Sequence, residues 1–528
     1  MGVKISRTDD SESSLTAARL FERGPRASGS AAPVLYLQPA LYGYLKRLLR
    51  TGAAYQASDV VSAAFGLLLL PVYTRALTRS QYGTAEVLLT AILTISIIVR
   101  LGGIEALVRY YYLHDDPAER DRVVRTATAW IFVASTAAAL LIGAFGEPLS
   151  KLVLGFHDAT LMWLTALGIW AYTNLEAAYA VLRVDERARP YLIASMTNVL
   201  LTIGLTVVLV VPLDQGARGM LLGNYGASAV VLLGLWFLLR GRLGVPSVRG
   251  HMPPMLRFGL PTVPAEVSVF LLNVIDRFYI YRTGPGGPGA AGLYSLAVKF
   301  AAVIIMVVRA FQYAWPPLAY SVKDDREASR LYATVTTYYV LFTGLIVAGM
   351  TLLGRWILRV FAAPAFFGAH EALPWVTLGW ALYGLFLILT VMAGRAKITT
   401  RNFPAAALGL GVNVLGLVLL VDPLGIAGAG IALCAAYVAM VTAMYLFARR
   451  LFPVAFEWGR LAHLVLVIGG ITVAGELLLP TAGAGGFLAP LVALVAIPAV
   501  LAATGFLRAG ETRRLRALVS RAGAARAA

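Results

Sequence analysis

The sequence predicts an all-α membrane protein of about fourteen transmembrane helices, and three observations support this fold class. The chain has 528 residues, of which 59% are hydrophobic and 14% are charged, whereas about 25% of residues are charged in a typical soluble domain. Apolar stretches recur from residue 57 to residue 507, each near the ~20 residues that a helix needs to span a bilayer. These stretches are continuous, whereas the strands of an outer-membrane barrel alternate in polarity over about 10 residues.

Fourteen spans are expected along the chain, and the eleventh and twelfth are the least clearly divided. Only the turn at Asp422-Pro423 separates these two. Because every backbone group must find a hydrogen bond inside lipid, each span is expected to be a helix. The predicted spans are 57–77, 84–107, 125–145, 160–183, 191–211, 217–240, 256–281, 291–315, 333–353, 372–393, 403–421, 425–447, 462–480 and 487–507.

The spans group into two lobes of six helices and a final pair. An interfacial helix is expected before the first span, where aromatic residues and leucines mix with Lys46, Arg47 and Arg50. The predicted domains are a cytoplasmic tail with this interfacial helix (1–50), an N-lobe (51–245), a C-lobe (246–450), the last two spans (451–510) and a basic cytoplasmic tail (511–528).

The charges in the loops predict the orientation of the chain. Loops on one side of the predicted spans carry 20 Lys or Arg, and loops on the other side carry 7. Lys and Arg are enriched in cytoplasmic loops of membrane proteins. Both termini are therefore expected in the cytoplasm, with the protein in the inner membrane of a bacterium.

Several function classes are disfavoured by the same composition. The net charge of +18 is explained by the cytoplasmic loops, so no nucleic-acid partner is expected. The single cysteine and five scattered histidines show no metal-ligand spacing, so we expect no metal or cofactor. No outer loop exceeds about 18 residues, which argues against an enzyme with an extracytoplasmic domain. The pairs Asp115-Asp116 and Asp324-Asp325 lie in polar loops and are interpreted as solvated charge.

An internal repeat relates the second and eighth spans. Gly83 lies 17 residues before Arg100, and Gly292 lies 17 residues before Arg309. Each pair follows an outer turn and lies on a long apolar span. The two spans are predicted to run in the same direction across the membrane. The repeat is therefore parallel and relates two lobes by an axis along the membrane normal.

Three cations inside spans are the strongest candidates for a binding site. Arg100, Arg309 and Lys299 lie at depth, where an ionised side chain costs about 2.5–3.5 kcal/mol on insertion scales. We expect them to line a central cavity between the lobes. A cationic cavity favours an anionic substrate, and guanidinium groups bind phosphates with two hydrogen bonds. A pyrophosphate-linked lipid is the membrane substrate that fits.

Acidic residues and prolines complete the candidate site. Since Asp276 and Arg277 are adjacent on a helix, each is expected to pair with a different helix. Pro261 and Pro264 are expected to form a hinge, because proline allows a span to bend. The cavity or gating charges expected in addition are Glu105, Glu176, Glu266, Asp276, Arg277 and Arg109.

Several short motifs follow one another across roughly residues 55–450. The motifs are Leu77-Thr78 through Tyr82-Gly83, Leu101-Gly102-Gly103 with Arg109-Tyr110, Phe258-Gly259-Leu260-Pro261, Asp276-Arg277, Gly292-x-Tyr294-Ser295 and Pro316-Pro317. Their order and spacing, which are more specific than any single motif, resemble those of the oligosaccharide flippases of the multidrug/oligosaccharidyl-lipid/polysaccharide exporter superfamily.

The resemblance implies a V-shaped, two-lobed transporter that works by alternating access. It implies that undecaprenyl-diphosphate carrying a sugar repeat unit moves from the cytoplasmic to the outer leaflet. It also implies a possible coupling ion, H⁺ or Na⁺, and a polysaccharide polymerase or export machinery as possible partners. Lipid II flippases of this superfamily use cavity arginines on the second and eighth helices, and Arg100 and Arg309 match that placement.

Three alternatives remain open from the sequence. A drug/cation antiporter of the same superfamily is expected to have an acidic, aromatic cavity, whereas the candidates here are mostly cationic. A lipid II flippase shares the fourteen spans, but the motifs of the seventh span are more similar to the polysaccharide branch. A membrane glycosyltransferase or polymerase is disfavoured by the absence of a large loop.

Overall fold

The computed structural model describes residues 66–244, 246–247, 250–396 and 401–506, and throughout these ranges the regular elements are helices. The prediction of an all-α membrane protein is confirmed. The predicted interfacial helix at 36–50, the start of the first span and the basic tail at 511–528 lie outside the described residues.

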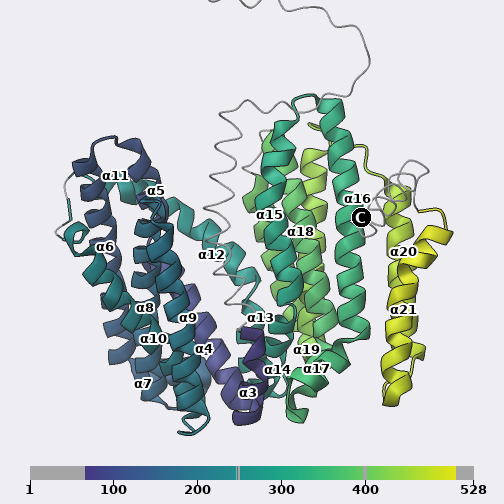
Figure 1. Ribbon diagram of the computed structural model, residues 1–528, viewed down its shortest axis with the longest axis horizontal. Helices are drawn as coiled ribbons and strands as arrows, with labels where there is room; N and C mark the ends of the chain where they lie inside the picture. Colours follow the sequence, from purple (N-terminus) through teal and green to yellow (C-terminus); the bar gives the residue numbers. More distant parts are fainter. Residues whose placement is uncertain (1–65, 245, 248–249, 397–400, 507–528) are drawn as a thin grey trace, which may run out of the picture. The chain divides into compact units, whose positions relative to one another are not determined.

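The first set of helices packs into one bundle, with α6, α8, α9 and α10 side by side (Figure 1). The short α5 lies against α6, and α4 contacts both α8 and α10. These helices are α3 (Leu70–Ala76), α4 (Arg79–Val99), α5 (Gly103–Leu113), α6 (Pro117–Ala144), α7 (Gly146–Leu154), α8 (Ala159–Val184), α9 (Ala188–Val210) and α10 (Gly216–Leu239), followed by the 3₁₀ turn η1 (Arg240–Arg242).

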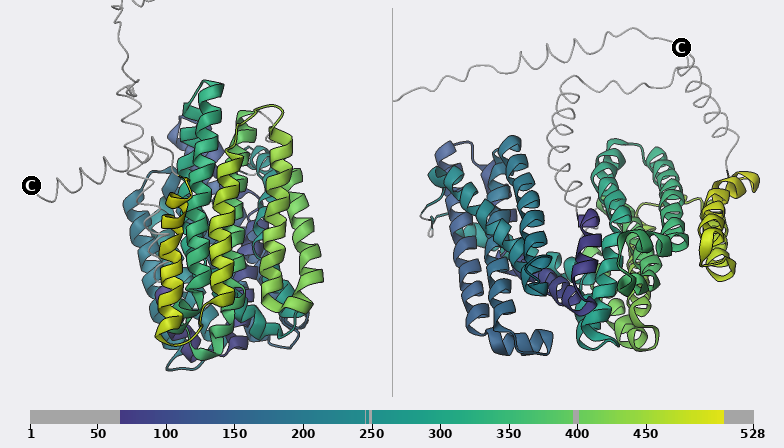
Figure 2. Two further views of the ribbon diagram at one scale, coloured as in Figure 1. Left: turned by 90° about the vertical axis from the view of Figure 1, so that its right-hand side faces the viewer. Right: turned by 60° about the horizontal axis from the view of Figure 1, so that its bottom comes forward.

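The second set forms another bundle around α18, which packs against α15, α16 and α19. Its elements are α11 (Met252–Gly259), η2 (Leu260–Thr262), α12 (Val263–Leu272), α13 (Ile275–Arg282), α14 (Gly287–Phe300), α15 (Ala302–Ser321), α16 (Asp325–Leu352), α17 (Gly354–Phe361), η3 (Pro364–Glu371), α18 (Leu373–Arg395) and α19 (Asn402–Ala448). Two last helices, α20 (Trp458–Leu478) and α21 (Gly483–Ala503), pack on α16 and on each other, as the view in Figure 2 shows in yellow.

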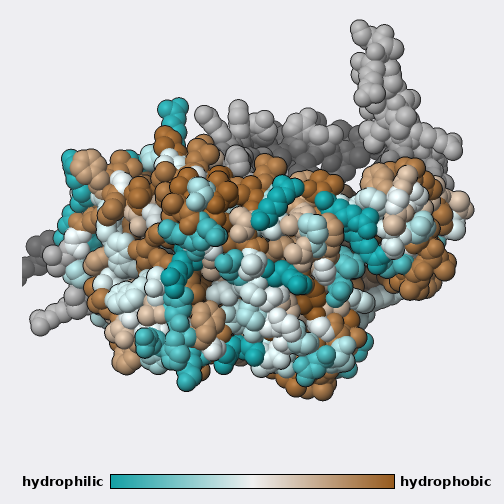
Figure 3. Space-filling view, turned by 90° about the horizontal axis from the view of Figure 1, so that it is seen from below, coloured by the Kyte–Doolittle hydropathy of each residue, from teal (hydrophilic) through white to brown (hydrophobic). Residues whose placement is uncertain are grey.

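Among the described residues, eleven helices are long and apolar enough to cross a membrane, or twelve if α7 and α8, which meet at 95°, form one bent span. The expected number of fourteen is not confirmed. Large apolar side chains on the flanks of the helices are open to lipid; Phe237, Leu466 and Leu478 are 70%, 73% and 80% exposed. At the end where α7 and α17 lie, hydrophilic residues interrupt the apolar surface (Figure 3).

The acidic pairs of the loops begin two of the long helices. The Asp116 carboxylate accepts a hydrogen bond from the amide of Ala118 at 3.1 Å, at the start of α6. The Asp324 carboxylate accepts one from the amide of Glu327 at 2.8 Å, at the start of α16. These carboxylates satisfy amides that have no partner within the helix and interact favourably with the positive end of its dipole.

The helix α19 is a hairpin of two arms. A straight helix of its 47 residues would be about 70 Å long, more than twice the hydrocarbon thickness of a bilayer. The chain reverses at Gly425, whose φ of 56° and ψ of −137° are not helical. A Cβ atom on Gly428 would lie 2.0 Å from the carbonyl oxygen of Leu420, and one on Gly416 would lie 2.7 Å from the Cβ of Ala432. The two arms therefore pack against each other, and the chain reverses two residues after the predicted Asp422-Pro423 turn.

The predicted second span, 84–107, is divided into α4 and α5. Between them Leu101 and Gly102 have positive φ values of 52° and 70°. A Cβ atom on Gly102 would lie 2.1 Å from the carbonyl oxygen of Gly259, so the backbone of the break is in direct contact with the end of α11. Hydropathy does not distinguish this break from a continuous helix, because the residues on both sides are apolar.

The predicted seventh span, 256–281, is also divided. The first part, α11, packs on α5, and Met255 is fully buried in the apolar core of the first bundle. The last part, α13, buries Ile280 and Tyr281 in the core that extends through the second bundle. The 3₁₀ turn η2 and α12 connect these two parts, so this span joins both bundles.

Candidate functional site

The two bundles meet where α4 crosses α14, and the crossing is made by the two glycines that the repeat relates. A Cβ atom on Gly83 would lie 1.9 Å from the carbonyl oxygen of Pro288 and 2.8 Å from the amide nitrogen of Gly292. A Cβ atom on Gly292 would lie 2.4 Å from the carbonyl oxygen of Arg79. The backbones are thus in contact, and neither position has space for a side chain.

Replacing Gly83 by leucine is expected to destabilise the protein by at least about 1–3 kcal/mol, the usual cost of overpacking, because the atoms that must move are backbone atoms. Fluorescence-detected gel filtration after a heat step would measure the loss. The control is Gly234→Leu on α10, because a Cβ atom at Gly234 has no atom within 4 Å. Equal heat resistance of the two variants would show that the crossing is looser than described.

Beside this crossing, Lys299 of α14 forms an ion pair with Glu86 of α4. The Glu86 carboxylate is buried, with 5% of the residue exposed, and the Lys299 ammonium lies 5.5 Å from the ring centroid of Tyr82. The sequence analysis predicted Lys299 as a free cation of a cavity. Its ammonium group is instead paired with Glu86. It holds the two bundles together through a carboxylate that the sequence analysis did not single out.

Asp276 and Arg277 point to different helices, as their adjacency predicts. The hydroxyl group of Tyr294 on α14 donates a hydrogen bond to the carboxylate of Asp276, of which 1% is exposed. The guanidinium group of Arg277 donates to the hydroxyl oxygen of Thr90 on α4 at 3.0 Å. Arg277 therefore makes a polar contact between α13 and α4, one turn along α4 from Glu86.

Arg100 ends α4 and forms an ion pair with Glu266 of α12. Its guanidinium group also lies 3.7 Å from the carboxylate of Glu105 on α5. The Arg100 side chain is 13% exposed, and its buried Nε has no hydrogen-bond partner. Two of the predicted acidic residues are thus the counter-ions of a predicted cation, and one guanidinium N–H remains unused.

Arg309 differs from the other two predicted cations. It lies on α15 with an exposed side chain, near enough to Tyr383 of α18 for its charge to act on the phenol. Within the described part of the chain, no hydrogen bond or ion pair is found for Arg309. Of the three predicted binding cations, Arg309 is therefore the one whose guanidinium group is open to a ligand.

The remaining predicted charges lie on the first bundle. Glu176 is half-buried on α8, and its charge acts on Tyr179. The guanidinium group of Arg109 on α5 lies 4.6 Å from the ring centroid of Phe258 on α11. This cation–π contact, worth about 0.5–1 kcal/mol at an exposed site, attaches α11 to the first bundle.

The linker before α11 is attached to the first bundle as well. Arg242 forms ion pairs with Asp185 and with Asp121, the latter at 2.8 Å, and His251 lies 2.9 Å from the carboxylate of Glu119. The linker and α11 are therefore both attached to the first bundle. Pro261 lies in η2 and Pro264 in the first turn of α12, and a 3₁₀ turn within a span often marks a hinge.

The fold is shared with known transporters. A structure described as the lipid II flippase MurJ in an inward closed conformation has a TM-score of 0.69 and 15% identity, and covers 86% of this chain and 98% of its own. An inward-facing multidrug resistance MATE family transporter of the MOP superfamily has a TM-score of 0.57 and 15% identity, and covers 75% of this chain and 94% of its own.

Two curated relatives are similar in sequence. The succinoglycan biosynthesis transport protein ExoT of Rhizobium meliloti (strain 1021) is 25% identical over 330 residues, which is 60% of this chain and 62% of the relative. The Lsg locus putative protein 1 of Haemophilus influenzae (strain ATCC 51907 / DSM 11121 / KW20 / Rd) is 22% identical over 362 residues, which is 66% of this chain and 82% of the relative. The match thus spans somewhat less than two thirds of ExoT.

The family of polysaccharide biosynthesis proteins matches residues 48–323, more than half of the chain. This range contains the crossing glycines, the Glu86–Lys299 and Arg100–Glu266 pairs, and Arg309. The chain is a multi-span membrane protein with the fold of the MurJ and MATE transporters, and it belongs to the polysaccharide biosynthesis protein family.

Proposed function

We propose that this protein moves undecaprenyl-diphosphate-linked oligosaccharide repeat units from the cytoplasmic to the outer leaflet of the bacterial inner membrane, for the synthesis of a surface polysaccharide. The family and the relative named for succinoglycan transport support a polysaccharide pathway. The fold shared with the lipid II flippase supports a transporter of a lipid-linked sugar.

The observation that carries the proposal is the state of two cations, Arg309 and Arg100. Arg309 is exposed and has no counter-ion among the described residues, so it is the first contact for a diphosphate. Arg100 is held by Glu266 but keeps an unused, buried N–H. A diphosphate that approaches Arg100 can take the place of the Glu266 carboxylate, because both are anions that a guanidinium group binds with two hydrogen bonds.

This exchange of partners couples binding to the arrangement of the helices. The Arg100–Glu266 pair joins α4 to α12, next to the 3₁₀ turn that contains Pro261. Loss of the pair leaves α12 free to move relative to α4. In an alternating-access cycle, the hinge at Pro261 and Pro264 then bends as the substrate binds.

The proposal includes an orientation with both termini in the cytoplasm, which the excess of Lys and Arg in the loops of that side supports. The bilayer and the lipid-linked glycan are the partners of the transport step. A coupling ion, H⁺ or Na⁺, and a polysaccharide polymerase or export machinery belong to the same proposal.

Deletion of the gene tests the proposal. The deletion strain is expected to lose its surface polysaccharide and to accumulate the undecaprenyl-linked intermediate in the cytoplasmic leaflet, and the wild-type gene is expected to restore both. The measurements are quantification of surface glycan and labelling of the intermediate from the outside. Normal polysaccharide together with altered drug tolerance would instead support the antiporter alternative.

A further inference from the structure

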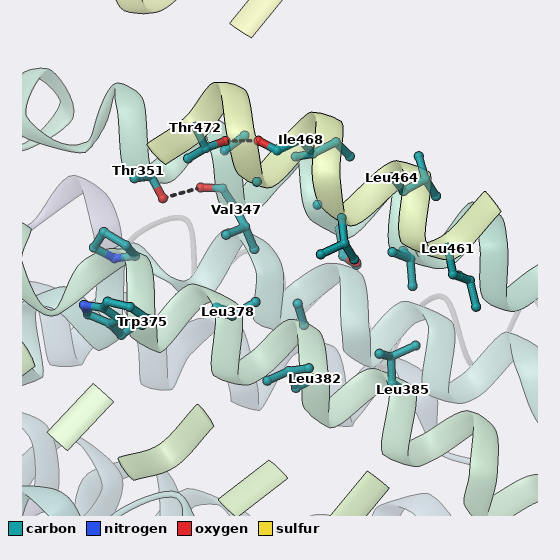
Figure 4. Close-up of a pocket in the computed structure, with 18 of the residues that line it drawn as sticks. Val347, Thr351, Trp375, Leu378, Leu382, Leu385, Leu461, Leu464, Ile468 and Thr472 are labelled. Carbon is teal, nitrogen blue, oxygen red and sulfur yellow. Dashed lines mark hydrogen bonds between the residues drawn. The ribbon is translucent and has the colours of Figure 1, made fainter. Parts of the chain in front are cut away.

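A long apolar groove lies between α16, α18 and α20, away from the cations of the candidate site. Its volume is about 850 Å³, within the roughly 300–1,000 Å³ typical of ligand pockets. Figure 4 shows Val347, Leu378 and Leu382 of α16 and α18 facing Leu464 and Ile468 of α20 across it. The lining residues of α20 extend from Trp458 to Leu477, about 28 Å along the helix.

The walls of the groove are apolar even where threonine lines them. The hydroxyl groups of Thr343 and Thr351 on α16 donate to the carbonyl oxygens of Tyr339 and Val347, each four residues earlier in the same helix. The hydroxyl group of Thr472 on α20 does the same to Ile468. Because these hydroxyl groups are satisfied within their own helices, the threonines present methyl groups to the groove, which suits a hydrocarbon chain.

The two ends of the groove differ in charge. At one end, Tyr445, Phe456 and Trp458 form an aromatic cluster with ring centroids 5.6–6.0 Å apart. The guanidinium group of Arg449 lies 5.9 Å from the ring centroid of Tyr445, and Arg449 and its neighbour Arg450 are exposed. The proposed orientation places this end at the cytoplasmic interface, where aromatic residues and cations meet lipid headgroups.

The opposite end has no spare positive charge among its lining residues. Arg355 is paired there with Glu476 at 2.6 Å, and Glu371 also lines this end. An anionic headgroup is therefore attracted to the end at Arg449 and is disfavoured at the end at Glu371.

The groove and the candidate site lie on different faces of α18. Leu378 and Leu385 line the groove, whereas Tyr383, which lies within the electrostatic range of Arg309, lies ~140–160° around the helix from them. Tyr383 instead contacts Tyr437 of α19, with ring centroids 5.4 Å apart. A lipid whose diphosphate is bound at Arg309 is therefore separated from the groove by α18, and the groove suits a different lipid.

We propose that the groove between α16, α18 and α20 is a binding site for an anionic phospholipid of the cytoplasmic leaflet. Its headgroup lies on Arg449 and Arg450, and one acyl chain occupies the half of the groove nearest Tyr445. The helices α20 and α21 pack mainly on α16. An acyl chain between α18 and α20 therefore also stabilises the position of these last two helices.

Two adjacent glycines of α20 provide a matched test of the chain site. Gly469 lines the groove and Gly470 does not, and a Cβ atom at either position has no atom within 4 Å. The full-length protein, delipidated in detergent, is titrated with phosphatidylglycerol and followed by native mass spectrometry. Gly469→Trp is expected to weaken retention of phosphatidylglycerol at least tenfold, whereas Gly470→Trp retains it as the wild type does.

The charge of the headgroup is tested separately. Arg449→Gln and Arg450→Gln are each expected to weaken phosphatidylglycerol binding about fivefold, since one cation near an anionic lipid surface contributes about 1 kcal/mol, and to leave phosphatidylcholine binding unchanged. Arg401→Gln is the control, because Arg401 lies over Phe447, 5.4 Å from its ring centroid, and Phe447 does not line the groove.

Three outcomes overturn the proposal. Equal retention by the two tryptophan variants shows lipid bound elsewhere on the surface. Equal loss of phosphatidylglycerol and phosphatidylcholine in the arginine variants shows that the headgroup charge is not recognised. If Gly469→Trp weakens the retention of undecaprenyl phosphate but not that of phosphatidylglycerol, the groove binds a polyprenyl chain. Glycan export by cells that carry the Gly469→Trp variant is measured separately. This measurement distinguishes a failure of the lipid-site proposal from a failure of the transport proposal.

Discussion

A Lys299→Met variant is expected to be about 3 kcal/mol less stable than the wild type. This is the lower end of the usual cost of removing one partner of a buried ion pair, because the Lys299 side chain is 33% exposed and solvent screens part of the interaction. Here the remaining charge is the Glu86 carboxylate, which is 5% exposed at the contact between α4 and α14. The measurement is the midpoint of thermal unfolding of the purified protein in detergent, together with the amount of folded protein in the membrane.

Two further variants decide the cause of that loss. Lys151→Met removes an exposed lysine from α7 and is expected to keep wild-type stability. The double variant Glu86→Gln/Lys299→Met has no buried charge at this point and is expected to recover most of the stability. If the double variant is as unstable as Lys299→Met, the effect comes from packing and the ion pair does not account for it. If the stable double variant exports glycan normally, Lys299 has no part in substrate binding.

Arg309→Ala is expected to lower glycan export about tenfold to a hundredfold without lowering stability. A hydrogen-bonded interaction with a charged group contributes about 1.5–3 kcal/mol, and the loss of one from the transport cycle corresponds to this range of rates. Stability is expected to stay unchanged because Arg309 is exposed and has no ion pair among the described residues. The measurement is complementation of the deletion strain at matched protein levels, with the leaflet of the lipid-linked intermediate as readout.

The nature of the contact is tested by two substitutions. Arg309→Lys keeps the charge but not the planar pair of donors, so we expect intermediate export. Arg282→Ala removes another exposed arginine, at the end of α13, and is expected to export as the wild type does. Normal export by Arg309→Ala would remove Arg309 from the proposed site and leave the family assignment intact.

The sequence predicted the helices well because hydropathy reports burial in lipid directly. Long apolar runs match both ends of α8, α9 and α10 within a few residues. They also match the end of α16, which begins eight residues earlier than predicted. The breaks in the second, seventh and eighth spans were missed; the eighth span is divided at Ala301, so Lys299 lies on α14 and Arg309 on α15. Such breaks depend on backbone contacts such as that of Gly102 with Gly259, which hydropathy does not report.

The candidate site was predicted in part for the same reason. Depth along a span identified Arg100, Lys299 and Arg309, but depth does not show which helices face each other. Glu86 lies near the start of its predicted span, and the sequence analysis did not single it out. A signal was available, because a lysine within a span requires a counter-ion, and Glu86 and Lys299 lie on the two helices that the repeat relates.

The contact of Gly83 with Gly292 has a consequence for the rate of conformational change. Where side chains interdigitate, two helices can change their crossing angle only as packed side chains change rotamer or separate. At this point backbone lies on backbone, so a change of angle requires no rotamer exchange. The activation barrier for reorienting the bundles then depends mainly on separating charges such as Glu86 and Lys299, and its height is expected to be electrostatic in origin.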